Sequence, residues 1–513
     1  MKRFIISLLS LITICTVSMQ AQSLSPNTGW HWRGNTIVTD VPQRPEGQKH
    51  VINLTTPKLP VVRVGFAGLG MRGPDAVDRF AHIPGTHTVA LCDYEKSRAE
   101  KCQKYLTNQG LPEAAIYSGE YGYVDMCRRS DIDLIYICAD WDHHFPIAKC
   151  ALENGKHVAI EVPSAMNLDQ CWELINLSEK HRLHCMILEN CCYDWFEMTT
   201  LNMAQQGVFG EIIRAQGAYI HDLSPFWDAY WKNGENDKLG WRLRYNRDNR
   251  GDVYATHGLG PVAQALNIHR GDRMTTLVAM DTKSVIGKDL VQQREGSCDN
   301  FRNGDHTTTL MRTAGGKVIE IQHNTMTPQP YNRLYQLTGT KGFANKYPVE
   351  GYAIDGNQLV AKGAMPKADN ISGHSFLSPE QHKAISEKYE HPILKKYGKL
   401  AKEVGGHGGM DFIMDARLVY CLQNGLPLDM DVYDLAEWCC LAELGALSMD
   451  NGCAPVEIPD FTRGHWDDVK GYQHAYATPE QEAAAEAAAK QGTAELKAQA
   501  LKQQAKAKKS KKK

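Results

Sequence analysis

The chain has 513 residues, of which 42% are hydrophobic and 23% are charged, and its formal net charge is -2. These fractions exclude a disordered chain, and the length is enough for two ordinary domains, each with its own core. Because the net charge is close to zero, no overall basic field is present to hold nucleic acid. Partners must therefore be inferred from individual sites.

The first residues, MKRFIISLLSLITICTVSMQA, combine a short basic start, an apolar run over 4–17 and a small residue at Ala21. This order is typical of a secretory signal peptide over 1–21, and the apolar run is too short for a comfortable membrane span. We therefore expect an exported protein, in the periplasm or at the cell surface, with no transmembrane span. An N-terminal arm is expected over 22–59.

Strand-like and helix-like segments alternate over 60–190, beginning with VVRVGFAG and ending with HCMILEN. The apolar runs are too continuous for half-exposed strands, so a parallel sheet covered by helices on both faces is expected. The fold class is thus α/β, with an N-terminal Rossmann dinucleotide-binding domain.

A glycine motif lies where that domain requires one. Gly68, Gly70 and Gly73 form G-x-G-x-x-G directly after a strand and at the opening of a helix. The glycines let the backbone turn tightly and approach a pyrophosphate at the helix N-terminus. Asp93 ends the second strand, where a carboxylate can accept from ribose hydroxyls and disfavours a 2'-phosphate. The expected cofactor is therefore NAD.

The segment 191–478 has a different pattern. Strand-like stretches EIIRAQGAYIH, MTTLVAMD, TTTLMRT, KVIEIQHNT and RLYQLTG follow closely, and Gly315-Gly316 favours a hairpin turn. We expect a C-terminal α/β domain with an open, predominantly antiparallel sheet, open on the face that meets the cofactor. The remaining residues, 479–513, are rich in Ala and Lys and are expected to form a frayed helix and a solvated tail.

The cysteines and histidines indicate no metal site. Fifteen cysteines are present, but adjacent pairs such as Cys191-Cys192 lie in apolar stretches and favour packing over disulfides. No C-x-x-C pair has zinc spacing. His407 and Asp411 are four residues apart, yet the neighbouring glycines favour a structural loop.

The stretch WDHHFPIAKCALENGKHVAIEVP joins a strand to a helix and the next strand. With the nucleotide-binding half before it and the sheet after it, this stretch resembles the glucose-fructose oxidoreductase family (Gfo/Idh/MocA). That family usually has a lysine between the glutamate and the proline, where this chain has Val162. The ordinary sugar dehydrogenase mechanism is thereby placed in question. The matching positions are His144, Gly155, Lys156, His157, Val158, Glu161 and Pro163.

Longer motifs look like those of glycoside hydrolase family 109, the NAD-dependent α-N-acetylgalactosaminidases. They are GLGMRG, EVP, ENCCYDWFEM, WRLRYNRDNRGDVYATHGLGP and GHGGMDFIMDARLVYCLQNGLPLDMDVYD. The resemblance implies a glycosidase that removes terminal α-linked N-acetylgalactosamine from a glycan or glycoconjugate. It implies a cycle of oxidation, elimination, water addition and reduction that regenerates NAD within each turnover. The open sheet of that family often supports dimers, so a homodimer is an expectation.

The resemblance also implies site residues. His257 is the best candidate for proton transfer, since an imidazole with an unperturbed pKa of about 6.5 can be both acid and base near neutrality. Tyr254 lies one turn earlier if the segment is helical, and Tyr193 is another candidate proton carrier, with packing as an equal alternative. The implied cofactor contacts are Gly68, Gly70, Met71, Arg72, Gly73, Asp93, Trp141, His144, Glu161, Val162 and Asn190. The implied sugar contacts are Tyr219, Arg242, Tyr254, Ala255, Thr256, His257 and Tyr331.

Two alternatives stay open at this point. An NAD(P)-dependent sugar oxidoreductase with tightly bound cofactor would form net NADH or reduce a second sugar, and Val162 in place of lysine speaks against it. An inactive NAD-containing sugar-binding protein would bind N-acetylgalactosamine without turnover, and the intact run over 254–257 makes it less attractive.

Overall fold

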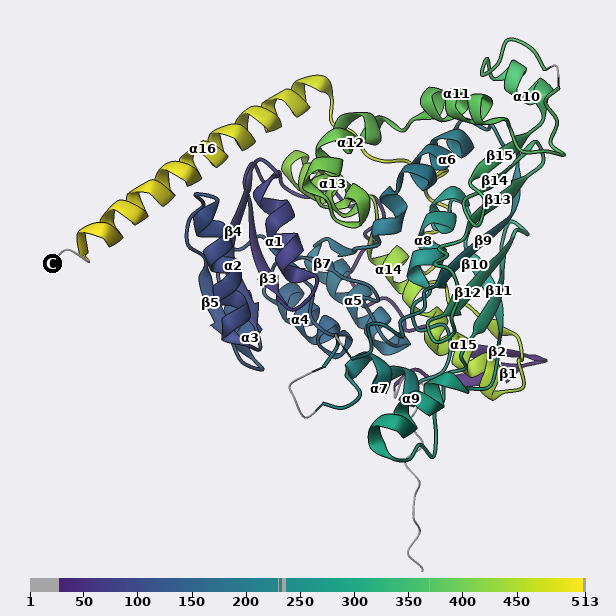
Figure 1. Ribbon diagram of the computed structural model, residues 1–513, viewed down its shortest axis with the longest axis horizontal. Helices are drawn as coiled ribbons and strands as arrows, with labels where there is room; N and C mark the ends of the chain where they lie inside the picture. The colour runs from purple at the N-terminus through teal and green to yellow at the C-terminus, as the bar shows by residue number, and fades with distance from the viewer. Residues whose placement is uncertain (1–26, 229, 233–236, 369, 511–513) are drawn as a thin grey trace, which may run out of the picture.

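The computed structural model describes residues 27–228, 230–232, 237–368 and 370–510. The predicted signal peptide lies outside these residues. Two β-sheets organise the described chain, and Figure 1 shows a layer of helices between them. Among the described helices, none combines the length and the apolar character that crossing a membrane requires.

The first sheet has six parallel strands in the order β5-β4-β3-β6-β7-β8. The chain enters at the centre, moves outward to β5 and returns past the centre to β8, which is the strand order of dinucleotide-binding folds. Every residue of β6, β7 and β8 is buried, as continuous apolar runs predict. The predicted Rossmann domain is confirmed. Its strands are β3 (Val62–Ala67), β4 (Thr86–Asp93), β5 (Ala115–Ser118), β6 (Leu134–Ile137), β7 (His157–Ile160) and β8 (Cys185–Ile187).

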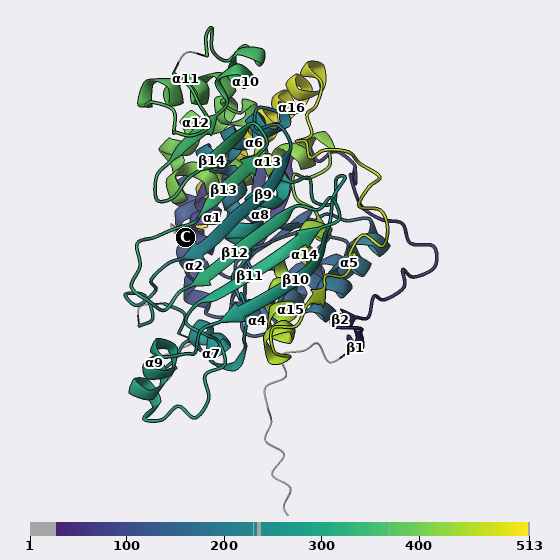
Figure 2. The same ribbon diagram turned by 90° about the vertical axis from the view of Figure 1, so that its right-hand side faces the viewer.

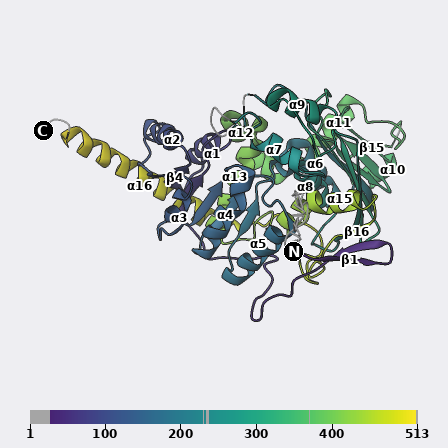
Figure 3. The same cartoon turned by 90° about the horizontal axis from the view of Figure 1, so that it is seen from below.

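Helices connect these strands and pack on the sheet or on one another (Figure 3). Their first turns lie at the carboxyl ends of the strands, where an open α/β sheet binds its ligands. The connecting helices are α1 (Gly73–Ala81), α2 (Lys96–Asn108), α3 (Gly122–Cys127), α4 (Trp141–Glu153) and α5 (Leu168–His181).

The second sheet has ten strands in the order β1-β2-β16-β10-β11-β12-β9-β13-β14-β15. It is mostly antiparallel, with parallel pairings only between β9 and β12 and between β2 and β16 among the described strands. Gly316 has a φ of +80° and donates its N–H to Thr313, which makes the predicted turn between β11 and β12. The predicted antiparallel character is confirmed. The strands are β1 (Trp30–Arg33), β2 (Thr36–Thr39), β9 (Ile212–Ile220), β10 (Met274–Asp281), β11 (Thr307–Thr313), β12 (Val318–Asn324), β13 (Tyr335–Gly339), β14 (Gly342–Asn345), β15 (Gly351–Ile354) and β16 (Val456–Glu457).

The open face of this sheet is not the one that was predicted. Helix α8 (Thr256–Ala265) packs on β9, β12 and β13, and α15 (Leu441–Asp450) packs on β10, so helices cover the face toward the Rossmann domain. Figure 2 shows the opposite face without a helix over it. There Met280, Leu310 and Val318 are 62%, 48% and 39% exposed. The inner face is covered because its alternating apolar side chains must be buried, and α8 thereby reaches the cofactor side.

The described helical segments after β8 are spread through this second part of the chain. Helix α13 is buried along its whole length and packs on α1 and β3 of the Rossmann domain, so the two parts interlock. The segments other than α8 and α15 are η1 (Asn190–Tyr193), α6 (Trp195–Gln205), α7 (Trp241–Asp248), α9 (Ile286–Glu295), α10 (Gly356–Ala361), α11 (Pro379–Tyr389), α12 (Pro392–Val404), η2 (His407–Gly409), α13 (Met410–Asn424), α14 (Val432–Cys439) and α16 (Pro479–Ser510).

The Ala/Lys-rich tail is more ordered than the prediction of a frayed helix. It forms α16, whose buried Ala489 contacts the Gly85 turn before β4, while Thr493 accepts the N–H of Gly85 at 2.9 Å. Small side chains let this helix approach the Rossmann domain closely. Farther along, α16 projects beyond that domain (Figure 1).

Candidate functional site

The glycine loop between β3 and α1 has the shape needed to hold a pyrophosphate. Gly68 has a φ of +87°, and a Cβ there would lie 2.3 Å from the main-chain nitrogen of Ala139. A Cβ at Gly73 would lie 2.0 Å from the carbonyl oxygen of Gly68. At Gly70 the nearest atom belongs to the tip of Arg98, 3.4 Å away. Two glycines therefore permit the turn, and the third leaves the backbone accessible to a dinucleotide.

Asp93 braces this loop from the end of β4. Its carboxylate accepts the N–H of Leu69 at 2.6 Å and the N–H of Glu95 at 2.8 Å, and Arg98 lies 3.6 Å away. Each carboxylate oxygen keeps a second lone pair for ribose hydroxyls. Asp93 thus holds the loop in shape and still carries the charge that disfavours a 2'-phosphate.

Helix α4 forms the next edge of the cofactor region. Trp141 is buried and stacks on Tyr254, with ring centroids 5.6 Å apart, which links the cofactor side to the predicted sugar residues. The ring nitrogens of His144 lie 2.8 and 2.9 Å from the carbonyl oxygens of Pro163 and Ala139. Burial lowers the pKa of this imidazole. Both partners are acceptors and a neutral imidazole carries one ring hydrogen, so His144 donates to one of these carbonyls at a time and lies buried between the two loops.

The other predicted cofactor residues near the strand ends differ in exposure. Met71 is 47% exposed at the tip of the glycine loop, whereas Val162 is only 4% exposed after β7. Val162 offers no group for proton transfer where the Gfo/Idh/MocA family usually has a lysine.

Arg72 connects the glycine loop to the C-terminal part of the chain. Its guanidinium donates to Asp411 at 3.0 Å and lies 3.5 Å from Glu161. The Asn190 amide donates to the other oxygen of Asp411 at 2.6 Å. Burial raises the pKa of the Asp411 carboxyl, but the hydrogen bond with His407 and the charge of Arg72 hold that pKa far below its usual range. An ionised, fully buried Asp411 therefore connects two predicted cofactor contacts, Arg72 and Asn190, to α13.

The loop that presents His407 is built from glycines. All five residues over 405–409 have positive φ, a run that is cheap only for glycine. The sequence predicted a structural loop here but not where it lies. In the structure, His407 of this loop contacts Arg72 of the glycine loop. Burial lowers the pKa of His257 and of His221, and His407 adds to the lowering in both cases.

A cluster of rings forms the predicted sugar site. The ring centroids of Tyr219 and Tyr254 are 4.8 Å apart, and His257 lies 5.3 Å from Tyr219 and 4.9 Å from Tyr254. Arg242 on α7 places its guanidinium 4.5 Å from the Tyr254 ring. Strand β9, helix α7 and the start of α8 thus bring four predicted sugar residues together. Aromatic faces and a guanidinium suit a sugar ring and its hydroxyls.

Tyr331 marks the open side of this cluster. It is 41% exposed and meets His221 edge-on at 4.9 Å, while His221 lies 3.1 Å from the Tyr219 hydroxyl. Arg333 is buried between these residues, 5.4 Å from the Tyr331 ring and 6.0 Å from the Tyr219 ring. Its Nε has no hydrogen-bond partner within the described part of the chain. A sugar oxygen at this position would satisfy a buried donor that is otherwise costly.

Glu189 holds the candidate catalytic histidine. Its side chain is fully buried, and Oε1 lies 2.6 Å from Nδ1 of His257. Burial lowers the pKa of His257 to about 4, although the charge of Glu189 acts in the opposite direction. Burial raises the pKa of Glu189, but His257, Thr256 and Arg333 together outweigh that effect and the net pKa is lowered. Near neutrality the pair is therefore a carboxylate that accepts the Nδ1 hydrogen of a neutral imidazole.

Tyr193 lies outside this cluster. Its hydroxyl donates to Asp429 at 3.0 Å, and Asp429 also pairs with Arg417 at 2.7 Å. The side chain is fully buried among these partners. The structure therefore supports the packing alternative for Tyr193 and does not bring it to His257 as a proton carrier.

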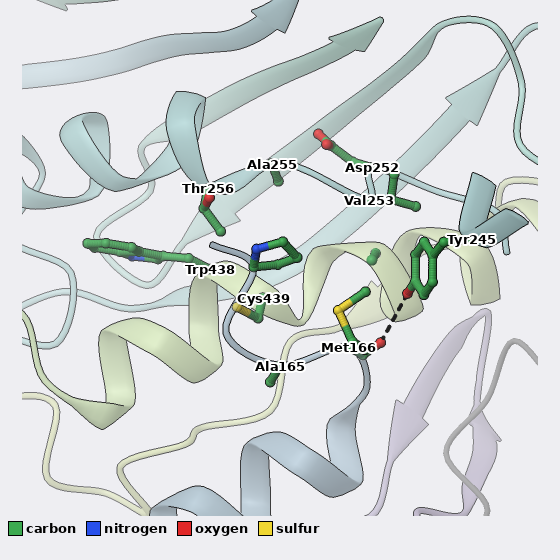
Figure 4. Close-up of a pocket in the computed structure, with 11 residues that line it drawn as sticks. Ala165, Met166, Tyr245, Asp252, Val253, Ala255, Thr256, Trp438 and Cys439 are labelled. Carbon is green, nitrogen blue, oxygen red and sulfur yellow. Dashed lines mark hydrogen bonds between the residues drawn. The ribbon is translucent and has the colours of Figure 1, made fainter. Parts of the chain in front are cut away.

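Ala255 and Thr256 line a different, small cavity (Figure 4). It lies between their segment and α14, and Tyr245 donates to the Met166 carbonyl at 3.4 Å on its far side. The structure therefore places both residues in the lining of this cavity. Trp438 on α14 lines the same cavity.

Sequence reasoning missed Glu189, His221 and Arg333. Glu189 follows β8 as Glu161 follows β7, and polar residues at such strand ends are a signal that could have found it. Arg333 is two residues from Tyr331, but nothing in the sequence indicates that its charge is buried.

Comparisons with known proteins agree with this geometry. Residues 62–188 match the model of the oxidoreductase family with an NAD-binding Rossmann fold. Residues 193–468 match the model of the glycosyl hydrolase 109 C-terminal domain. Among solved structures, levoglucosan dehydrogenase in complex with NADH has a TM-score of 0.56 at 18% identity, with 78% of this chain and 99% of that chain covered. This last likeness concerns the fold.

Curated relatives are much closer. Glycosyl hydrolase family 109 protein 5 of Phocaeicola vulgatus is 72% identical over 100% of this chain and 99% of its own length. Glycosyl hydrolase family 109 protein 1 of Bacteroides thetaiotaomicron is 58% identical over 86% of this chain and 93% of its own. The chain has an NAD-binding Rossmann domain followed in sequence by a glycosyl hydrolase 109 C-terminal domain, and it belongs to glycosyl hydrolase family 109.

Proposed function

We propose that this glycoside hydrolase removes terminal α-linked N-acetylgalactosamine by a cycle with no net redox change. The observation that carries the proposal is the direct contact between the two halves of the site. Trp141, at the cofactor edge, stacks on Tyr254, which adjoins His257 in the ring cluster. A sugar in that cluster would lie beside a cofactor held by the glycine loop.

When bound, NAD would supply a reversible oxidation at carbon 3 of the sugar, which would make the hydrogen on carbon 2 acidic. The chain supplies the proton transfer. His257 is neutral near pH 7 and has Nε2 free of hydrogen-bond partners among the described residues, so it can take that hydrogen as a proton. Loss of the group on carbon 1 and addition of water follow, and His257 returns the proton.

Other residues orient the sugar. Burial raises the pKa of Tyr254, so its hydroxyl stays protonated and is available to donate to the sugar. The sugar hydroxyls and the acetamido group are bound by Tyr219, Arg242 and Tyr331. The two tyrosine rings also cover the apolar side of the sugar.

The test uses the mature protein with no added cofactor and p-nitrophenyl α-N-acetylgalactosaminide or its β anomer. We expect phenol release from the α anomer without net NADH absorbance. His257→Ala should lose this activity, whereas His382→Ala, on α11, should retain it. Net NADH formation would favour a sugar oxidoreductase instead, and binding without release would favour an inactive sugar-binding protein.

We also propose export to the periplasm or cell surface, supported by the N-terminal sequence, and a homodimer through the outer face of the ten-stranded sheet, supported by exposed Met280, Leu310 and Val318. Mass spectrometry of the purified protein from its natural host tests cleavage after residue 21. Sedimentation of Leu310→Glu against the unmodified chain tests the dimer.

A further inference from the structure

Glu189 and His257 come from different halves of the fold and meet in a fully buried contact. Glu189 follows β8 of the Rossmann sheet, and His257 is the second residue of α8 under the large sheet. Oε1 of Glu189 accepts the N–H of Cys191 at 3.1 Å as well as the Nδ1 hydrogen of His257 at 2.6 Å. The carboxylate is thus fixed by its own backbone, and it fixes the imidazole in turn.

This arrangement leaves one ring nitrogen for chemistry. A neutral imidazole carries a single hydrogen, and a carboxylate partner at Nδ1 keeps that hydrogen there. Nε2 then carries a lone pair. The titratable or charged groups that face His257 from the surrounding elements are Glu189, Cys191, Tyr219, Tyr254, Arg333 and His407.

We propose that Glu189 is the positioning residue of His257, holding its Nδ1 hydrogen and stabilising the imidazolium that forms when Nε2 accepts a proton. The inference rests on the proposed function of His257. In the step it assists, the bond between carbon 2 and hydrogen breaks, the proton moves to Nε2, and the electron pair stays on the sugar as an enolate. Nδ1 keeps its hydrogen throughout, and the proton on Nε2 is later returned.

The charge of Glu189 matters because the imidazolium would form in a buried site. Without a nearby anion, a positive charge there carries a large desolvation cost. Arg333 gives the carboxylate a counter-charge, since its guanidinium donates to Cys191 Sγ at 2.8 Å beside Glu189, and it helps keep Glu189 ionised.

The same three side chains could also surround a metal ion. Ligand atoms of Glu189, Cys191 and His257 lie within 4.8 Å of one another. Arg333 argues against this use, because its guanidinium already donates to the thiol sulfur that a metal ion would need as a ligand. A proton-handling role accounts for all four side chains.

The experiment compares Glu189→Gln and Glu189→Asp with a matched control. A second buried pair, His269 with Glu437 at 2.5 Å, has both side chains 1% exposed and lies on α14 and the turn before β10. Glu437→Gln therefore removes the same kind of contact elsewhere. For each holoenzyme we would measure NAD content, kcat, KM and the pH profile of kcat/KM on the p-nitrophenyl substrate.

Glu189→Gln should lower kcat by about a hundred-fold or more with little change in KM or NAD content, because it removes part of the general-base contribution. The acidic limb of its pH profile of kcat/KM should also move to lower pH, because the carboxylate that stabilises the imidazolium is gone. Glu189→Asp should recover part of the rate with the carboxylate restored. Glu437→Gln should leave kcat, KM and the pH profile unchanged. A folded, NAD-containing Glu189→Gln protein with unmodified kcat and pH profile would overturn the inference.

A second readout does not need activity. Carbethoxylation of His257 by diethyl pyrocarbonate, followed by peptide mass spectrometry from about pH 2.5 to pH 7, reports when this imidazole becomes neutral, since its pKa is about 4. We expect its midpoint to fall in Glu189→Gln and to stay in place in Glu437→Gln. If the midpoint in Glu189→Gln does not move, the inference about Glu189 is overturned, whether or not the unmodified protein is active. If the unmodified protein hydrolyses neither substrate, the proposed function is refuted instead. If Glu189→Gln does not fold, Glu189→Asp carries the same comparison.

Discussion

Replacing Asp411 tests whether the cofactor loop depends on helix α13. The Asp411 carboxylate is fully buried and receives hydrogen bonds from Arg72 at 3.0 Å and Asn190 at 2.6 Å. Arg79 lies 3.7 Å from the same oxygen as Arg72. Asp411→Asn keeps the size of the side chain but leaves two guanidinium groups without this shared anion.

The magnitude follows from burial. Removing one partner of a buried ion pair costs about 3 to 5 kcal/mol, because the other charge stays buried and uncompensated. Arg79 keeps Asp415 at 2.6 Å and Arg72 keeps Glu161 at 3.5 Å, so neither guanidinium is left without an anion, and we expect the lower end, about 3 kcal/mol. Since Arg72 belongs to the glycine loop, retained NAD should decrease as well.

Guanidinium-induced unfolding and NAD content after purification measure both effects. Asp131→Asn is the control, because Asp131 pairs with Arg129 at 2.6 Å but is 51% exposed, and such pairs contribute at most about 1 kcal/mol. An Asp411→Asn protein whose stability and NAD content match those of the control would refute the reasoning. A double variant with Arg72→Gln should then lose less than the sum of the single changes.

The remaining predictions concern the glycine loop, acid stability and the sugar site. Gly73→Ala should destabilise the protein with or without NAD, because its Cβ would lie 2.0 Å from a carbonyl oxygen, whereas Gly70→Ala, with 3.4 Å to the nearest atom, should weaken NAD retention alone; melting curves and cofactor content separate the two. Burial lowers the pKa of His391 to about 3, and its ring accepts the N–H of Ile393 at the start of α12, so stability should fall as the pH decreases below about 6.5. His391→Asn keeps an acceptor without titrating there, so it should flatten this fall by up to about 1.4 kcal/mol per pH unit in denaturation curves at pH 7, 6 and 5. Arg242→Lys should raise KM more than it lowers kcat in steady-state assays, since the planar guanidinium that packs on the Tyr254 ring is lost.

The nucleotide-binding half could be predicted from sequence because its signals are local. Continuous apolar runs require a covered parallel sheet, and Gly68 and Gly73 stand where any Cβ would strike backbone. The five strands expected in the second half also appear, because alternating β-branched residues and a Gly-Gly turn act over a few positions. Matching motifs along most of the chain indicated the family.

Other features depend on contacts between distant segments. The open face of the large sheet was predicted on the wrong side, since periodicity shows that one face is buried but not which helix buries it. Tyr193 has the residue type of a proton carrier, yet tertiary packing turns its hydroxyl to Asp429.

The sequence by itself determined the Rossmann fold, the cofactor loop and the types of residue available for sugar chemistry, because these follow from short-range sterics and hydrophobic periodicity. Only the tertiary structure decided which of those side chains meet. Glu189 contacts His257 across more than sixty residues of chain. Asp411 contacts Arg72 across more than three hundred. Such pairs form because each buried charge must find its partner, and that requirement leaves no mark in local sequence.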